Sequence, residues 1–453
     1  MSVTGGTGVD AITFITSVLT NVTVDGGTNT GDSIAAVPAG ANVATFKDMD
    51  TVSLAAGTGT TSYTISGTTA TAVTAQTVGT ASTITSTSTA LTTVSQTATV
   101  AIALAGTGAF SISGGTTGAI TSTSTGSGQL TVTSSANAQT VTSSAPTTVE
   151  AALLNAALTI NGTGAFTVNG LGTASGSSVT ETGNASHSGA MTINTASTGA
   201  NTMAITEVSG ATGAVTVNAL GSTGLITLTA LASHTSQTIT MATGTALTVD
   251  AASTSTAYGV TMTGSGSHTY VNSSTTSSVD TIDASAATGT TAITGALGND
   301  IIKLGGATDT VIFAATLALN GADTITAFTS GTDKLNLDAL TTTTSYVTTV
   351  GTTQNVFTTG TQAVTIAAGS LYVVTTVTLG GADTAAAAAT AISAGAVWTN
   401  ATTGNIAYFV VVDNNSSSVW SMTEAAGTEV ETTELTLMGT IDATLVTGDI
   451  VIA

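Results

Sequence analysis

Residues 295 to 337 read GALGNDIIKLGGATDTVIFAATLALNGADTITAFTSGTDKLNL, and they gather glycines, carboxylates and short apolar runs as no other part of the chain does. Gly295 to Lys303 fits the nonapeptide G-G-x-G-x-D-x-U-x, with Ala296 in place of the second glycine. Glycines let a turn reach positive φ and aim its carbonyls inward, and Asp300 adds a carboxylate. Because Ca²⁺ prefers hard oxygen ligands, this pattern predicts a calcium-binding turn, followed by a short strand with Ile302 inside.

A second, degenerate copy of the nonapeptide runs from Leu304 to Ile312, and Asp309 keeps its acidic position. In a regular calcium roll, ligand loops recur every two nonapeptides, or about eighteen residues. Counting back eighteen from Asp300 falls one short of Asp283, and counting back from Asp309 reaches Thr291. We therefore expect individual calcium sites completed by irregular loops or a neighbouring subunit, not a regular ladder. Ordinary Gly-Asp turns are the alternative, because these residues dominate turns.

The whole stretch resembles the end of the repeats-in-toxin (RTX) calcium region of proteins exported by type I secretion. Asp309–Phe313, Gly321–Phe328 and Gly331–Leu337 carry this resemblance, which is most similar to bacterial surface-layer (S-layer) proteins. Val279–Ser285 resembles the strand before the calcium turns in those proteins. Ala327 departs from the pattern, because the family usually has an aspartate there.

The other end of the chain carries the same motif, since Gly5 to Thr13 matches the nonapeptide at every fixed position. The resemblance implies Ca²⁺ as the cofactor. The candidate metal-binding positions are Gly5, Gly8, Asp10, Asp280, Asp283, Gly295, Gly298, Asn299, Asp300, Asp309, Asp323 and Asp333. Four carboxylates in the first 60 residues are second-tier candidates, with solvated turn carboxylates as the alternative: Asp25, Asp32, Asp48 and Asp50.

The charge balance supports a divalent cation as a partner. Charged residues make up 6% of the chain, against about 25% in an average globular protein. The 24 acidic residues face only three lysines, Lys47, Lys303 and Lys334, and no arginine. The net charge of −21 argues against nucleic acid and against docking on anionic lipid. The chain also has no cysteine, so disulfides and thiolate chemistry are excluded.

If the protein is exported, we expect a secretion signal other than a cleaved N-terminal signal peptide. The first residues lack the basic region and apolar core of a secretory signal, and no stretch of about 20 apolar residues predicts a transmembrane segment. The resemblance implies an uncleaved C-terminal signal for type I secretion, and Val446–Ala453 is similar to its short apolar ending. An ordinary terminal strand is the alternative.

From about residue 61 to 270 the chain consists almost entirely of Thr, Ser, Gly, Ala, Val and Ile. Strict alternation, as in Gln129–Thr133 and Ala214–Asn218, indicates half-buried strands. Gly106–Ile112 returns as Gly162–Val168, which indicates stacked repeats. Their uneven spacing fits a parallel β-solenoid or a series of β-sandwiches. Disorder is the competing interpretation, and an apolar fraction of 42% favours folding.

The C-terminal region predicts more strands from 341 to 379, and then one short helix near 383–394. Asp383 can cap this helix, an alanine run propagates it and Gly395 ends it. Ile406–Met422 predicts a hairpin, which also resembles the C-terminal ends of type I secreted RTX proteins.

The predicted class is thus all-β, with β-solenoid or serial β-sandwich modules, or both, and RTX-like turns. We expect four regions: an N-terminal β region with an RTX-like turn (1–60), a Thr/Ser-rich β-repeat region (61–270), a calcium-binding RTX-like region (271–340) and a C-terminal β region with the secretion signal (341–453).

Catalytic patterns are absent from the sequence. The histidines His187, His234 and His268 have no metal-ligand spacing, and we expect them on the surface or in hairpins. There is no H-E-x-x-H helix and no G-x-S-x-G elbow, so we do not expect an enzyme.

We expect instead a secreted structural protein that self-assembles into a calcium-dependent lattice of identical subunits on the bacterial cell surface. The resemblance implies lipopolysaccharide as its anchor. A calcium-dependent adhesin or an ice-binding solenoid is the alternative, because Thr-x-Thr rows on a flat face can order water. A secreted enzyme with a small site is the third possibility.

Overall fold

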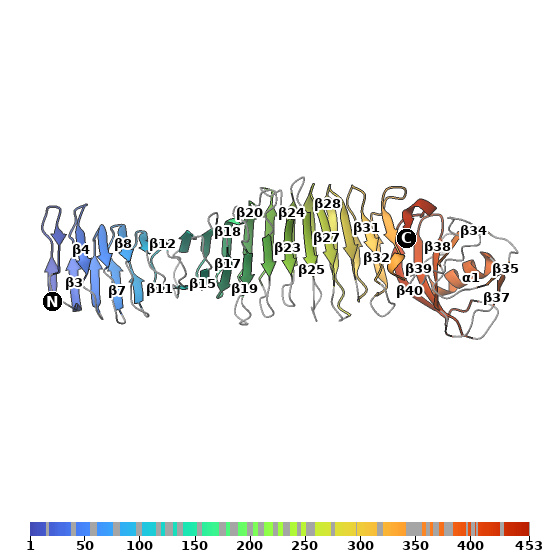
Figure 1. The fold of residues 1–453 in the computed structure, drawn as a ribbon, viewed down its shortest axis with the longest axis horizontal. Coiled ribbons are helices and arrows are strands. Elements are labelled where there is room, and N and C mark those ends of the chain that lie inside the picture. The colour runs from blue at the N-terminus through green and yellow to red at the C-terminus, as the bar shows by residue number, and fades with distance from the viewer. Residues whose placement is uncertain are drawn as a thin grey trace. The chain divides into compact units, whose positions relative to one another are not determined.

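The computed structural model describes residues 1–14, 18–37, 42–54, 61–75, 82–96, 102–114, 119–122, 130–133, 139–151, 156–171, 178–181, 189–196, 203–206, 213–220, 225–229, 236–241, 246–250, 259–272, 277–295, 297–314, 320–340, 356–358, 363–365, 371–375, 384–395, 397–399, 404, 406–425 and 430–452. In this part of the chain the protein is mostly strand and forms a β-solenoid (Figure 1). The all-β prediction is confirmed in its solenoid form. The chain divides into two compact units, Met1–Thr229 and Ala230–Ala453.

In the first unit the chain passes back and forth between two parallel sheets, so odd-numbered strands pair with one another and even-numbered strands do the same. The odd sheet contains β1 (Ser2–Thr4), β3 (Thr20–Asp25), β5 (Val43–Lys47), β7 (Thr61–Ser66), β9 (Ser82–Ser86), β11 (Ile102–Gly106), β13 (Ala119–Ser122), β15 (Gln139–Ser143), β17 (Ala157–Asn161), β19 (Ser178–Glu181), β21 (Met203–Thr206) and β23 (Leu225–Thr229). The even sheet contains β2 (Ala11–Ile12), β4 (Ser33–Val37), β6 (Thr51–Leu54), β8 (Thr71–Ala75), β10 (Thr92–Gln96), β12 (Phe110–Gly114), β14 (Leu130–Thr133), β16 (Thr147–Glu150), β18 (Phe166–Leu171), β20 (Met191–Thr195) and β22 (Val215–Ala219).

The even sheet shows why the alternating sequence forms a solenoid. Successive side chains of a strand point to opposite faces, so every second residue enters the core. One inward column of this sheet is aliphatic in every coil and fully buried. Its members are Val52, Val73, Val94, Ile112, Val132, Val149, Val168, Ile193 and Val217. Because a shift of one residue would turn the whole set toward solvent, this column fixes the register.

The repeated heptapeptide marks equivalent corners of stacked coils. Gly106 and Gly162 both adopt positive φ, +101° and +103°, where the chain leaves the odd sheet. A Cβ at either position would also collide with the backbone of the preceding coil, at Ser86 and Ser143. Both corners then lead into a buried phenylalanine, Phe110 or Phe166, in the even sheet. The predicted stacking of these repeats is confirmed, and their uneven spacing reflects connections of different length.

The second unit continues the same alternation and ends in a coil assembled from distant sequence. Its odd sheet contains β25 (Ala246–Asp250), β27 (Ser267–Val271), β29 (Thr291–Thr294), β31 (Thr310–Ile312), β33 (Lys334–Asn336) and β41 (Ile450–Val451). Its even sheet contains β24 (Ser236–Met241), β26 (Gly259–Gly264), β28 (Thr281–Ala287), β30 (Ile301–Lys303), β32 (Asp323–Thr326) and β40 (Leu435–Ile441). β40 pairs with β32 and β41 pairs with β33, both in parallel, although residues 341–434 intervene.

Hydrogen bonds connect this closing coil to the coil before it. The Asp442 carboxylate accepts hydrogen bonds from the amides of Ala327 (2.8 Å) and Phe328 (3.2 Å). Lys334 Nζ donates to the Gly448 carbonyl at 2.8 Å. The C-terminal segment therefore has the structural role that was the alternative to a secretion signal, and its part in export stays a prediction.

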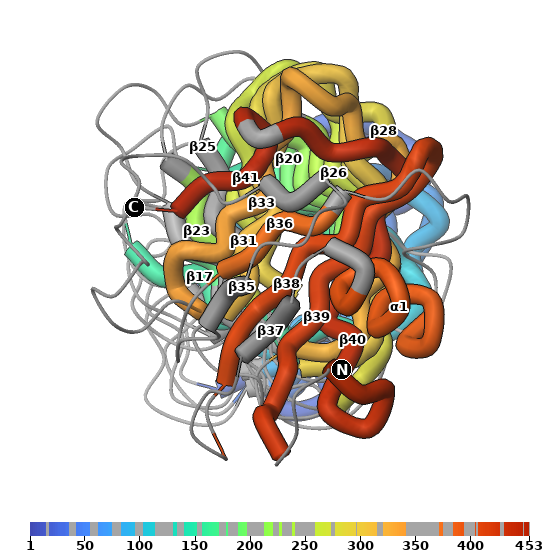
Figure 2. The backbone as a smooth tube through the Cα atoms, turned by 90° about the vertical axis from the view of Figure 1, so that its right-hand side faces the viewer, coloured from blue at the N-terminus to red at the C-terminus, as the bar shows by residue number. Residues whose placement is uncertain are grey.

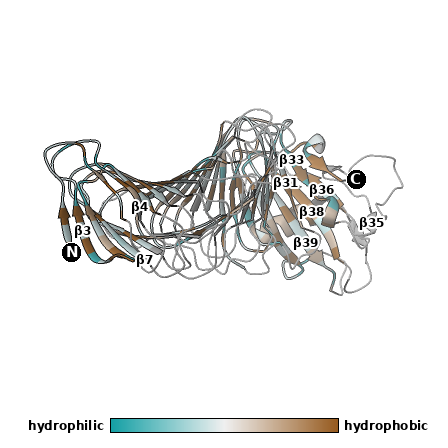
Figure 3. Ribbon diagram, turned by 60° about the vertical axis from the view of Figure 1, so that its left-hand side comes forward, coloured by the Kyte–Doolittle hydropathy of each residue, from teal (hydrophilic) through white to brown (hydrophobic). Residues whose placement is uncertain are grey.

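The intervening residues form a small module of strands around one helix. It contains β34 (Val356–Thr358), β36 (Leu371–Thr375), β38 (Ile406–Val412) and β39 (Ser417–Thr423), the pair β35 (Ala363–Thr365) and β37 (Val397–Thr399), α1 (Ala385–Gly395), and two 3-10 turns bordering it, η2 (Asp338–Leu340) and η3 (Thr447–Asp449). β38 and β39 are antiparallel, so the predicted hairpin is confirmed. Figure 3 shows apolar residues along β36, β38 and β39, and Figure 2 looks onto α1 beside them. Ala388 and Ile392 of α1 pack in a core with Tyr372, Phe409 and Trp420.

The predicted helix is confirmed, with a different cap. Thr384 precedes α1, and its hydroxyl accepts a hydrogen bond from the Ala387 amide at 3.2 Å. Threonine satisfies a free helical amide in this way. Asp383, the predicted cap, lies outside the described residues.

The predicted region boundaries near residues 60 and 270 are changes in composition. Strand stacking continues across both of them, because β5 pairs with β7 and β26 pairs with β28.

Candidate metal centre

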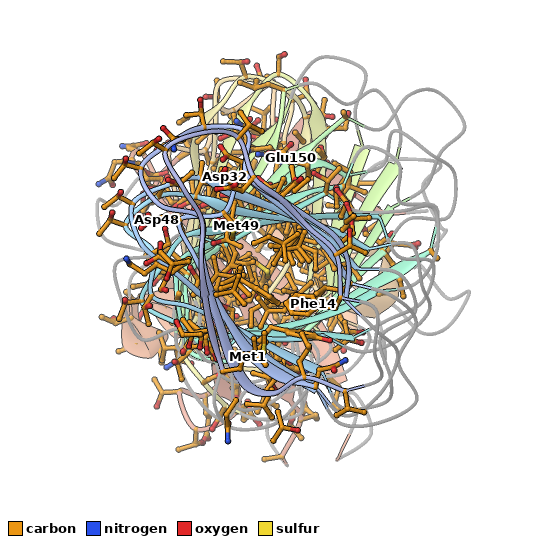
Figure 4. All side chains as sticks on the ribbon, turned by 90° about the vertical axis from the view of Figure 1, so that its left-hand side faces the viewer. Met1, Phe14, Asp32, Asp48, Met49 and Glu150 are labelled. Carbon is orange, nitrogen blue, oxygen red and sulfur yellow. The ribbon has the colours of Figure 1, made fainter. Side chains whose placement is uncertain are left out.

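Aspartates stack along one corner of the first unit. Asp10, Asp32 and Asp50 stand directly before β2, β4 and β6, at the same register position in three successive coils. The Asp10 amide donates to Asp32 Oδ1 at 2.8 Å, and the Asp32 amide donates to Asp50 Oδ2 at 3.0 Å. Asp32 and Asp50 therefore each accept the amide of the aspartate in the coil before. We call this set the first carboxylate column; Figure 4 shows Asp32 at the edge of the coil and Met49 turned into its interior.

The second unit has two such columns. In the second carboxylate column the Asp280 amide donates to Asp300 Oδ1 (2.7 Å), and the Asp300 amide donates to Asp323 Oδ1 (2.9 Å). These residues stand before β28 and β30 and at the start of β32.

The third carboxylate column runs along the odd sheet. The Thr291 amide donates to Asp309 Oδ1 (2.7 Å), and the Asp309 amide donates to Asp333 Oδ1 (2.9 Å). Asp449 extends it into the closing coil by accepting the Gly331 amide at 2.7 Å.

The aspartates of each column stack from coil to coil, whereas the expectation of individual calcium sites stays a prediction. Stacked aspartates are 20 and 23 residues apart in the second column and 24 apart between Asp309 and Asp333. A fixed spacing of eighteen fails because the loops between coils differ in length. It holds between Thr291 and Asp309 and between Asp32 and Asp50.

Several of these carboxylates also accept a hydrogen bond within their own turn. In three turns the carboxylate accepts an amide four residues earlier: Asp10 from Gly6 (2.6 Å), Asp309 from Gly305 (2.8 Å) and Asp333 from Thr329 (2.7 Å). Asp32 Oδ2 and Asp300 Oδ2 have no hydrogen-bond partner, although both residues are 0% exposed. A buried carboxylate oxygen without a partner is costly, so both sites call for a cation or a proton.

Glycines leave room beside these unpaired oxygens. A Cβ on Gly295 would lie 2.7 Å from Asp300 Oδ2 and 3.3 Å from Asp323 Oδ2. A Cβ on Gly26 would lie 2.9 Å from Asp32 Oδ2 and would collide with the Asp48 carbonyl. Carboxylate and carbonyl oxygens thus approach the same glycine from two successive coils. The donor set of hard oxygens fits Ca²⁺.

The electrostatics of the second column also call for neutralisation. Burial raises the pKa of Asp300 to about 8, against the lowering effect of the Asp280 amide, and the charges of Asp323 and Asp280 raise it further. Burial likewise raises the pKa of Asp323 to about 7. The pKa of Asp309 is raised by burial and by the charge of Asp333. Asp300, and Asp323 in part, would therefore hold a proton at neutral pH unless a cation were bound.

The three lysines are engaged elsewhere. Lys47 Nζ lies 2.7 Å from Asp25, and Lys334 Nζ binds a backbone carbonyl. Lys303 interacts electrostatically with Asp283. Burial raises the pKa of Asp283, but the hydrogen bonds from Ser285 and the positive charge of Lys303 together outweigh burial and lower it. No arginine exists to take their place.

Two other predicted positions, Asp283 and Asn299, lie outside the columns. Asp283 lies in β28, and its carboxylate accepts hydrogen bonds from the Ser285 amide (2.9 Å) and hydroxyl (2.5 Å). Asp280, which was also predicted, is the residue stacked on Asp300, and calcium binding by Asp283 stays a prediction. The Asp280 side chain accepts Asn272 Nδ2 at 2.7 Å. Asn299 Oδ1 accepts the Ala322 amide at 2.9 Å.

Two other predicted positions, Gly8 and Gly298, differ in their surroundings. A Cβ at Gly8 would meet open space. Gly298 has φ +142°, and a Cβ there would collide with the Ser278 carbonyl.

Within the described residues, no three carboxylate or imidazole side chains converge to form a metal site by themselves. Backbone carbonyls would have to complete any calcium site. Nor does this part of the chain contain a helix long and apolar enough to cross a membrane.

His268 corrects another expectation. It is 1% exposed in β27 rather than on the surface, and neither ring nitrogen has a partner. Burial lowers the pKa of the His268 imidazole. His187 and His234 lie outside the described residues.

In the coils after Asp50, residues other than aspartate occupy the register position of the first carboxylate column. Strand register places Thr71 and Thr92 after Asp50, and then Phe110, Leu130, Thr147, Phe166, Met191 and Val215. A corner of this solenoid therefore closes without a carboxylate. Sequence reasoning ranked Asp32 and Asp50 second and missed Asp449. The signal that unites Asp10, Asp32 and Asp50 is an aspartate directly before each even strand.

Comparison with protein-family models, curated proteins and solved structures found no match to this chain.

Proposed function

We propose that this protein is a secreted structural protein that assembles, in a calcium-dependent manner, into a two-dimensional layer on a bacterial cell surface. Export by type I secretion and anchoring to lipopolysaccharide belong to the same proposal. Its main support is the pair of buried, unpaired oxygens, Asp32 Oδ2 and Asp300 Oδ2. In the first unit, the coils that follow Asp50 close the same corner without any carboxylate.

The mechanism links folding to location. Without calcium, the stacked carboxylates repel one another or hold protons, and the coils that contain them are destabilised. Extracellular calcium, at millimolar concentration, matches the affinities of extracellular sites and would neutralise the columns. Binding free energy then becomes folding free energy. Acidic subunits neutralised in this way repel one another less and can pack side by side.

Negative-stain electron microscopy with calcium and with chelator tests the proposal. We expect ordered sheets with calcium only. Asp300→Asn should weaken this response, and Asp283→Asn is the matched control because its carboxylate lies outside the columns. Sheets that form equally well in excess chelator would contradict the proposal.

One observation favours ice binding as a second candidate. The outward position before the aliphatic column of the even sheet is threonine in most coils, including Thr93, Thr131 and Thr148. The parallel column two residues on becomes Glu150, Asn169 and Asn194, so a continuous double row of threonines is not present. Measurement of thermal hysteresis separates this candidate from the layer.

A further inference from the structure

A long segment of the first unit contains no charged residue. No Asp, Glu, Lys, Arg or His occurs between Asp50 and Glu150. This segment covers the even strands β6, β8, β10, β12 and β14 and the odd strands between them. A surface without charge is unusual for a soluble protein, because charge keeps monomers apart. In a chain of net charge −21, this segment is where two copies can approach with the least repulsion.

The even sheet offers a regular surface over this segment. Its two outward columns continue to β22 and present small polar side chains, which we call the hydroxyl face. The first column contains Thr51, Ala72, Thr93, Ser111, Thr131, Thr148, Thr167, Thr192 and Thr216. The second contains Ser53, Thr74, Ser95, Ser113, Thr133, Glu150, Asn169, Asn194 and Asn218.

Side chains within the second column are already ordered. Asn169 Nδ2 donates to Glu150 Oε1 at 2.8 Å, and Asn194 Nδ2 donates to Asn169 Oδ1 at 2.7 Å. Such a ladder reduces the entropy that its side chains would lose on binding. Neither outward column contains an aromatic residue on which a sugar ring could stack, which disfavours a glycan as the occupant.

We propose that the hydroxyl face is a contact between copies of this chain, packed face to face about a two-fold axis. This inference rests on the proposed layer and names one of its subunit contacts. Rows of similar, mostly small side chains can pack against a second copy of themselves, as in the dry interfaces between stacked sheets. With the axis near Thr131, Glu150 of one copy faces an uncharged part of the other, so no like charges meet.

The size of the face fits a lattice contact. Nine strands spaced about 4.8 Å apart extend for about 40 Å, and three residues across span about 10 Å. The resulting area of roughly 400 Å² per copy is half of the roughly 800 Å² per partner in a standard interface. A single contact is therefore weak, and order arises when each subunit makes several.

Charge placed on the face tests the proposal. Thr93→Glu with Thr131→Glu puts two carboxylates on the hydroxyl face, two strands apart. Thr45→Glu with Thr85→Glu is the matched control, since both residues point outward from the odd sheet, also two strands apart. In calcium, sedimentation velocity should show association weakened at least tenfold for the first pair and less than twofold for the control. High salt should restore association of the first pair. Circular dichroism verifies that both variants are folded.

Cross-linking provides a second, independent measurement. Because the chain has no cysteine, Thr131→Cys introduces a single thiol near the proposed axis. Oxidation should yield a disulfide-linked dimer in calcium, whereas Thr85→Cys should remain largely monomeric.

The outcomes separate this inference from the layer itself. If wild-type protein forms sheets and the Thr93/Thr131 variant does so equally, the layer stands and the hydroxyl face is not its contact. If wild-type protein does not associate in calcium, both proposals fail. Equal losses in the two charged variants, or thermal hysteresis that disappears with the Thr93/Thr131 variant while association is unchanged, would also overturn the inference.

Discussion

The first carboxylate column and its continuation offer a comparison within one corner of one unit. Asp32 and Asp50 occupy this corner in early coils, whereas Thr92 and Phe110 occupy the same register position later. In the later coils this corner is stabilised by hydroxyl hydrogen bonds or by apolar packing. One example is the hydrogen bond between the Ser86 and Thr92 hydroxyl oxygens, which lie 3.0 Å apart. The backbone is the same, so the solenoid does not need buried carboxylates. Their presence is consistent with the calcium binding that we propose for this protein.

The largest expected effect is the loss of calcium stabilisation in Asp300→Asn. Binding that occurs only in the folded state stabilises one site by about 2.7 kcal/mol when calcium is a hundredfold above its Kd. The variant should lose most of this gain and should be more stable than wild type in chelator, because it does not have to take up a proton to keep its buried side chain uncharged. Thermal unfolding with calcium and with chelator measures both effects.

Asp283→Asn is the control for that experiment, and its calcium response should equal that of wild type. If Asp300→Asn is destabilised in chelator as well, the carboxylate is a structural cap and the calcium assignment fails.

A second expectation concerns pH. The folded-state pKa values of Asp300 and Asp323, about 8 and about 7, lie above the ordinary value of 3.8. The folded protein therefore binds protons more tightly than the unfolded chain. In chelator, this contribution to stability is complete below about pH 4 and is lost as the pH rises through 7 to 8.

Calcium should reverse that dependence over the same range, because the metal requires ionised carboxylates. Denaturant titrations at pH 5, 7 and 8.5 give the two profiles. Stability in chelator that rises between pH 5 and 8.5 would contradict the assignment.

A third experiment extends the column by one coil. Thr71 follows Asp50 in register and is buried. Thr71→Asp should destabilise the protein in chelator by about 1–3 kcal/mol, since it buries an unpaired polar group. Calcium should recover part of this loss. Thr71→Val, which carries no charge, should show no difference between calcium and chelator beyond that of wild type.

The smallest expected effect lies at Ala327, which has φ +60° at the joint with the closing coil. A left-handed conformation costs about 1 kcal/mol for a residue with a Cβ. Ala327→Gly should therefore stabilise the protein by up to that amount, with or without calcium. A calcium-dependent change at this position would show that the joint and the carboxylate columns are coupled.

The sequence by itself determined the local structure of this protein. Alternating β-branched residues predicted strands such as β14 and β22, the alanine run predicted α1, and the polar turn predicted the β38–β39 hairpin. Gly295 to Lys303 predicted a corner with Asp300, followed by a strand with Ile302 buried. Each signal is carried by neighbouring residues, so periodicity and turn chemistry are enough to detect it.

Tertiary structure alone decided which residues meet. Period-two alternation does not identify the neighbouring strand, and uneven loops made Asp280, not Asp283, the partner of Asp300. The closing coil pairs β32 with β40 across residues 341–434, a connection that local patterns cannot reveal. Loop-closure entropy grows only slowly with length, so such an insertion is tolerated. Coil stacking, rather than local propensity, therefore aligned the carboxylates and made the columns.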